Sequence, residues 1–175
     1  MEPIHWELDK EQSELRFKIE RQLIPDIKGR FSMFEIDVVS RDYELTDAVI
    51  TLEIDVYSLD TDDDDHDELL KSDSFFDADN HPVINFKSSA FNKIRGDDHV
   101  LIGMLTFGGT TKEIIFAASF GGQTKDGFGN SRISLEFQGI VNRTDFMPVH
   151  EQHSTFKLSN ELHLHADLQF AKRYQ

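Results

Sequence analysis

The sequence predicts an all-β protein of eight antiparallel strands with one short helix inserted between them. Apolar side chains alternate with polar ones along most of the chain, and turn-forming residues recur at hairpin-like spacing. The alternation is interrupted once, between residues 58 and 86. No repeated strand–helix–strand pattern is present, so the sheet should be antiparallel. A chain of 175 residues is expected to form a single domain covering residues 1–175.

The interruption predicts a helix around residues 65–74. Paired leucines at positions 69 and 70 are followed by paired phenylalanines at 75 and 76, a spacing that fits a helix better than a strand. The carboxylates before them suit a helix start, where acceptors meet free backbone N–H groups. Pro82 then restarts an extended segment. We expect the stretch 67–77 to form a wall or lid of the fold.

The strands each present one apolar face. The phase slips between Met33 and Phe34, which predicts a β-bulge. The segment 100–107 is apolar on both faces, and the glycine pair after it predicts a tight hairpin. The residues expected on one buried face are Leu15, Phe17, Ile19, Ile36, Val38, Ala48, Ile50, Leu52, Ile54, Val56, Ile84, Phe86, Ile114, Phe116, Ala118, Phe120, Ile133, Leu135, Phe137, Gly139, Val141, Leu162, Leu164, Ala166, Leu168 and Phe170.

Two architectures fit such a meander, a sandwich and an up-and-down barrel. Strands of about ten residues, rising roughly 3.3 Å each, give a barrel some 30 Å tall. An eight-stranded barrel is either filled by side chains or holds one small ligand. The chain has 15 Phe against 3 Tyr and 1 Trp, so its apolar mass is concentrated in large rings. This excess and the extra helix favour a barrel with an apolar cavity.

Composition excludes several classes of function. The net charge of −15 argues against nucleic acid or an anionic membrane surface as the main partner. With no cysteine, disulfides, cysteine-ligated zinc and thiol catalysis are excluded. The first residues lack the features of a signal peptide, and no apolar run approaches roughly 20 residues, so no stable membrane insertion is expected. A cytoplasmic location is expected if Met1 is the native start, and a periplasmic one if this is a trimmed mature form.

No metal, cofactor or catalytic residue is predicted. The acidic run 60–67 lacks the glycine and glutamate of a calcium loop. His163 and His165 share one strand face and are expected to point to solvent, while His150 and His153 lie in a predicted loop. No carboxylate stands at a recognisable zinc-ligand spacing from them. Nucleophile-elbow and phosphate-loop patterns are also missing from the sequence.

Arg143 and Asp145 are the charged residues that we most expect to have a specific role in the fold or the site. They stand two residues apart beside Phe146, in a segment expected to close one end of the barrel. An ion pair between them is the favoured interpretation, because buried charges need partners. The alternative is that Arg143 contacts the polar headgroup of a ligand.

Seven short motifs occur in order along nearly the whole chain. They are W-x-L-D-x-x-x-S-x-L-x-F at 6–17, G-R-F at 29–31, S-L-D-T at 58–61, H-D-E-L-L-K-S-D-S-F-F-D at 66–77, P-V-I-N-F-K-S at 82–88, G-M-L-T-F-G-G-T-T-K at 103–112 and N-R-T-D-F at 142–146. Each is weak alone, but together they resemble the YceI-like family of lipid- or polyisoprenoid-binding proteins.

The resemblance implies a lipocalin-like antiparallel barrel that holds a long isoprenoid chain in an apolar tunnel, often as a homodimer. Departures from the family pattern occur at polar positions expected near the tunnel mouth. His66 replaces an arginine, Leu69 and Arg21 each replace a histidine, and Met147 replaces a glycine. The ligand headgroup, or the ligand class, could therefore differ.

Burial is the physical basis of the function that we predict, a non-enzymatic carrier or sequestering protein for a polyisoprenoid, isoprenoid quinone or similar lipid. Each buried CH₂ contributes about 0.8 kcal/mol, so a few prenyl units give a large favourable term. One alternative is an enzyme using Asp67, His66 or Asp145 as acid or base, and another is a stress or interaction protein with a filled barrel. The residues predicted to bind the ligand, each with ordinary core packing as the competing explanation, are Phe17, Phe34, Phe76, Phe86, Met104, Phe116, Phe137, Phe146 and Arg143.

Overall fold

The computed structural model describes residues 2–147 and 158–174. Its elements are the strands β1 (Ile4–Leu8), β2 (Glu14–Arg21), β3 (Ile27–Phe31), β4 (Phe34–Ser40), β5 (Val49–Asp55), β6 (Leu59–Asp60), β7 (Val83–Arg95), β8 (Asp98–Phe107), β9 (Thr110–Ser119), β10 (Gln123–Lys125), β11 (Ser131–Asn142) and β12 (Leu158–Lys172), the helix α1 (Asp64–Lys71), and the 3₁₀ turns η1 (Lys10–Gln12), η2 (Val56–Ser58) and η3 (Arg143–Asp145).

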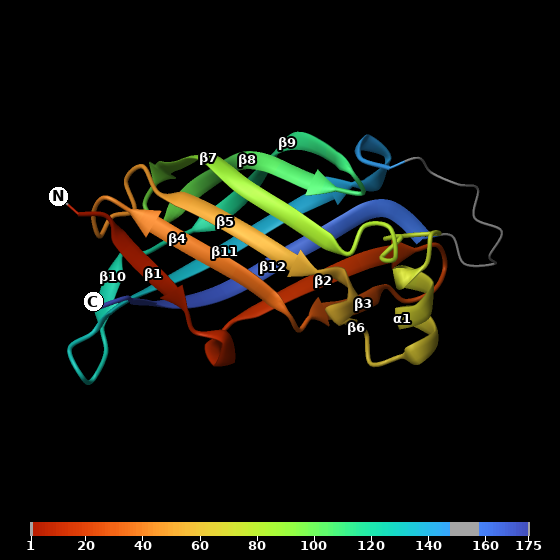
Figure 1. Ribbon diagram of the computed structural model, residues 1–175, viewed down its shortest axis with the longest axis horizontal. Coiled ribbons are helices and arrows are strands. Elements are labelled where there is room, and N and C mark those ends of the chain that lie inside the picture. Colours follow the sequence, from red (N-terminus) through yellow and green to blue (C-terminus); the bar gives the residue numbers. More distant parts are fainter. Residues whose placement is uncertain (1, 148–157, 175) are drawn as a thin grey trace.

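Eight strands close into an antiparallel barrel, as the sequence predicts (Figure 1). Around the ring, β4, β5, β7, β8, β9, β11, β12 and β1 follow one another, and β1 pairs again with β4. Three short breaks in the chain, η1, Ser32–Met33 and η2, separate β1 from β2, β3 from β4 and β5 from β6. The strands β2, β3 and β6 extend one side of the barrel wall next to β12. The break before Phe34 falls at the predicted phase slip.

The buried side chains form one apolar core inside this wall. The faces predicted to be buried in β9, β11 and β12 point inward, as the alternating burial of these strands shows. In the described part of the chain, no helix is both long enough and apolar enough to span a lipid bilayer.

Helix α1 lies at one end of the barrel, beside β3 and β6 (Figure 1). It begins where the Asp63 carboxylate accepts hydrogen bonds from the backbone N–H groups of Asp65 and His66, at 3.0 and 3.1 Å. It ends at Lys71, three residues earlier than predicted, because the backbone of Ser72 is extended. The two phenylalanines therefore lie in the turn that follows the helix, and both are buried.

The β8–β9 hairpin has the two-residue turn that its glycine pair predicts. Gly108 and Gly109 have φ angles of +59° and +83°, which favour glycine. A Cβ atom at Gly108 would lie 2.2 Å from Cγ of Met147. Met147, which stands where the family pattern has glycine, therefore packs directly on this turn.

The turn provides a test of that packing. Gly96, in the β7–β8 turn, has φ +55° but no atom within 4 Å of its would-be Cβ. Gly96→Ala should lower the free energy of unfolding by about 1–2 kcal/mol through backbone strain alone. Gly108→Ala should lower the free energy of unfolding further. In a chain that also carries Met147→Ala, the two glycine substitutions should cost the same. Urea unfolding measures these free energies, and equal losses at the two glycines would contradict the packing.

Candidate ligand-binding site

A small apolar void lies at the centre of the barrel. Its volume is about 30 Å³, and its exposed lining consists entirely of apolar surface. The lining residues come from eight strands and are Leu15, Ile36, Ile50, Leu52, Phe86, Leu101, Phe116, Phe137, Leu164 and Ala166. An engineered apolar cavity that binds benzene has a volume of about 150 Å³, so a long ligand requires this void to widen.

Three of the residues predicted to bind a ligand meet at this void. Phe86, Phe116 and Phe137 all line it, and the rings of Phe86 and Phe116 pack edge to face at 5.5 Å. The aliphatic lining residues were absent from the predicted set. Strand alternation identified most of them as buried, but gave no signal to separate cavity lining from ordinary core.

Met104 does not belong to the interior, so that prediction is wrong. Its side chain is 44% exposed on the outer wall, where β8 pairs it with Lys87 and Glu113. Because both faces of β8 are apolar, the sequence did not show which of its alternate side chains point into the barrel. Leu101 and Leu105 point inward instead.

Six phenylalanines, Phe17, Phe31, Phe75, Phe76, Phe107 and Phe146, form a second group, which we call the end cluster. The Phe76 ring is central, with its centroid 4.8 Å from that of Phe75, 5.9 Å from that of Phe107 and 6.4 Å from that of Phe17. Phe146 joins through Phe107 at 5.7 Å. Phe34 lies apart from this cluster, buried in β4 opposite Ile54. The structure thus separates the predicted aromatic residues between the central void and the barrel end.

Arg143 is buried at this end with 3% of its surface exposed. Its guanidinium lies 3.9 Å from the centre of the Phe75 ring and donates to the Phe75 carbonyl at 2.8 Å and to Asn160 Oδ1 at 3.1 Å. Burial lowers the pKa of Arg143 to about 10, so the group is still positively charged at neutral pH. Its Nε atom has no hydrogen-bond partner among the described residues.

The predicted ion pair with Asp145 is not formed. Asp145 is exposed, and none of the ion pairs between described residues includes Arg143. The sequence could not identify the real partners, because one is a backbone carbonyl distant in the chain and the other is an amide on β12. The result is a buried cation that faces the turn after α1 and has no carboxylate partner in the described ranges 2–147 and 158–174.

Strands β9 and β11 are long but share only a short paired stretch. Within the described residues these strands pair only where Ala117–Ser119 meet Glu136–Gln138. Just beyond, Phe116 lies over Gly139, where a Cβ atom would come within 2.3 Å of the ring. Phe116 therefore borders both the central void and this seam.

The positions that depart from the family pattern lie near α1 and the start of β12. His66 Nδ1 is 3.6 Å from an Asp63 carboxylate oxygen, and Leu69 packs partly buried against the core. Arg21 pairs with Leu158 in the sheet and donates to the Pro25 carbonyl. These three residues therefore contact other parts of the chain, in one region of the barrel.

A pair of substitutions tests how Arg143 is held. Arg143→Lys should lower the free energy of unfolding by about 1–3 kcal/mol. Lysine cannot both stack on the Phe75 ring and donate hydrogen bonds to the Phe75 carbonyl and to Asn160. Asp145→Asn should change it by less than about 0.5 kcal/mol, as expected for an exposed side chain. Chemical denaturation measures both, and a similar loss in the two variants would restore the ion-pair interpretation.

Comparison with known proteins gives the family. A UPF0312 protein of Staphylococcus aureus is 30% identical over 141 residues, which cover 79% of this chain and 78% of the relative. Burkholderia cenocepacia BcnA shares the fold with a TM-score of 0.79 at 20% identity, covering 93% of this chain and 99% of the other. A polyisoprenoid binding domain from Saccharophagus degradans, implicated in plant cell wall breakdown, has a TM-score of 0.68 at 14% identity and coverages of 97% and 98%. The family model of the YceI-like domain matches residues 6–170, and the chain belongs to this family.

Proposed function

We propose that this protein binds a long apolar molecule, such as a polyisoprenoid, an isoprenoid quinone or a similar lipid, inside the barrel without transforming it chemically. The observation that carries the proposal is the wholly apolar lining of the central void, which offers a ligand no directional polar contact. The fold shared with a polyisoprenoid binding domain supports it. The affinity would come from burial, at about 0.8 kcal/mol for each methylene.

Binding must be coupled to widening of the interior, because the void is only about 30 Å³. The side chain best placed to move is Phe116, which borders the void and the weakly paired seam. Rotation of its ring would connect the two without breaking further strand pairs. Ligand uptake in this account is limited by side-chain rearrangement, so it should be slow relative to diffusion.

Arg143 would receive the polar end of the ligand. A buried guanidinium whose Nε–H has no hydrogen-bond partner and which has no carboxylate partner among the described residues attracts an anionic or strongly accepting headgroup. Headgroup binding would have to displace part of the turn after α1, because the Phe75 ring and carbonyl now cover the guanidinium. This assigns the turn, rather than α1 itself, the role of lid.

A filled barrel that serves as an interaction protein is the second candidate. The small size of the void favours it, since a barrel already packed with side chains needs no ligand. The enzyme alternative has less support. Asp67 accepts hydrogen bonds from the backbone N–H and the hydroxyl of Thr61 at 2.8 and 2.7 Å, which assigns it a structural role. The homodimer implied by the family resemblance stays a prediction, to be checked by light scattering.

Binding of geranylgeraniol, a C20 prenyl alcohol, tests the proposal. It should raise the unfolding midpoint of the wild-type protein, and Phe116→Ala should bind it about tenfold more tightly because the void is already open. Phe116→Leu provides the same test if truncation to alanine destabilises the fold by the expected about 3–5 kcal/mol. Met104→Ala, on the outer wall, is the matched control and should bind as wild type does.

The measurements are thermal unfolding with and without the alcohol, and calorimetric titration. A wild-type protein and Phe116 variants that show no stabilisation would reject the interior site and favour the filled-barrel candidate. An equal effect of Met104→Ala and Phe116→Ala would place the binding surface elsewhere.

A further inference from the structure

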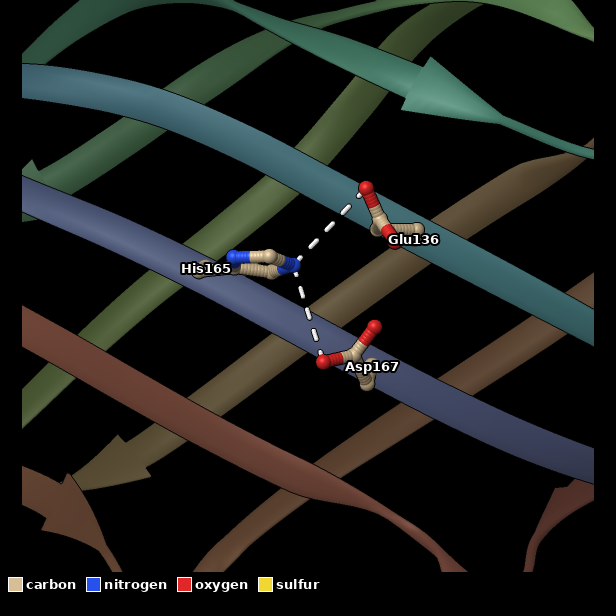
Figure 2. A group of neighbouring side chains, drawn as sticks. All are labelled: Glu136, His165 and Asp167. Atoms are coloured by element: carbon tan, nitrogen blue, oxygen red, sulfur yellow. Dashed lines mark ion pairs between the residues drawn. The ribbon is translucent and has the colours of Figure 1, made fainter.

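Three side chains with metal-ligating atoms meet on the outer wall of the barrel (Figure 2). Strands β11 and β12 pair so that Glu136 lies opposite Asp167, and His165 is two residues before Asp167 on the same face. Glu136 and His165 are far apart in sequence, which is why spacing along the chain gave no zinc pattern. The register of the two strands creates the cluster.

The distances suit a single ion. His165 Nε2 is 3.8 Å from Glu136 Oε1 and 3.6 Å from Asp167 Oδ2, and one ligand atom from each residue lies within 4.8 Å of the other two. Two atoms that each lie about 2.1 Å from zinc can be at most about 4.2 Å apart, so closure needs side-chain shifts of roughly half an ångström. No change of the backbone is required.

The imidazole nitrogen has an unmet interaction. His165 Nε2 is buried and has no hydrogen-bond partner among the described residues, although it points between the two carboxylates. A buried polar atom of this kind normally has a partner. A cation held jointly by the nitrogen and both carboxylates would supply one.

Neighbouring donors orient the two carboxylates. Arg16, on β2, donates to Asp167 Oδ2 at 2.7 Å and also lies 3.8 Å from Glu14, while Gln138 donates to Glu136 Oε1 at 2.9 Å. Outer partners of this type hold metal ligands in place. Arg16 opposes a cation through its own charge and donates to Oδ2, the Asp167 oxygen that lies 3.6 Å from His165 Nε2, so an ion would share this carboxylate with Arg16. The net charge of −15 favours cation binding over the whole surface.

We propose that Glu136, His165 and Asp167 form a binding site for one divalent transition-metal ion of the zinc class. The mixed nitrogen and oxygen set favours such an ion over calcium or magnesium, which prefer oxygen alone. The three side chains are 35–45% exposed, so water completes the coordination. The ion links β11 to β12 and is independent of the barrel interior.

His163 provides a matched control. It lies on the same face of β12, two residues earlier. Its Nε2 also has no hydrogen-bond partner among the described residues and is 3.8–3.9 Å from two carboxylates, those of Glu20 and Glu161. Within the described part of the chain, those two residues do not form a group with His163 in which all ligand atoms lie close together. Removing His163 deletes an equivalent imidazole without touching the proposed ligands.

Calorimetric titration of the untagged protein with ZnCl₂ after EDTA treatment tests the site. The chain should carry His150→Asn and His153→Asn, so that these histidines contribute nothing. The expected result is one ion per chain, a loss of at least about tenfold in affinity with His165→Ala and with Glu136→Gln, and no change with His163→Ala. Zinc should also raise the unfolding midpoint, and excess Ca²⁺ should not compete.

Three results would overturn the proposal. The first is that the parent chain shows no saturable binding up to about 1 mM zinc, a concentration that corresponds to very weak affinity. The second is unchanged zinc binding in His165→Ala, and the third is loss of zinc binding in His163→Ala. Glu136→Gln carries the same test if His165→Ala fails to fold. Unfolding midpoints in EDTA verify that the variants are folded.

Discussion

The pairing of β11 with β12 is the constraint on which the rest of the structure depends. It runs from Arg132–Ala171 to Asn142–Glu161, and it closes the ring of strands. Once this register is fixed, alternate residues must point inward, so Phe137 and Leu164 face the central void. The same register places Glu136 beside His165 on the outside. One interface thus sets both the apolar interior and the proposed metal site.

Closure has a consequence for binding. A closed sheet has no free edges, so a ligand can enter only through an end or where the wall is weakly paired. The end near α1 is filled by the end cluster and by Arg143, whose guanidinium is fixed by a stacked ring and a carbonyl. The seam beside Phe116 is the other candidate route. Both routes require side chains to move before a long ligand can enter. In the proposed account, the packed barrel is therefore the ligand-free state.

Much of the fold followed from the sequence, because strand alternation and turn chemistry are local. The glycine pair at 108–109, the break before Phe34 and the inward faces of the last strands were all predicted correctly. The errors have local causes too. Met104 was misplaced because both faces of its strand are apolar, and α1 was extended too far because the sequence did not show that Ser72 would be extended and end it.

The candidate site was predictable only in part. Phe86, Phe116 and Phe137 were identified as aromatic residues on buried faces, yet the size of the void depends on packing that no residue pattern encodes. The contacts of Arg143 involve a backbone carbonyl and a residue on another strand, so the nearby Asp145 was the more obvious but incorrect partner.

Mass spectrometry of an organic extract from natively purified protein tests the central claim most directly. The account predicts a long-chain isoprenoid, quinone or other lipid at close to one molecule per barrel. A clean blank from the wild-type protein, together with no uptake of added prenyl alcohol, would contradict it and leave the filled barrel as the better description.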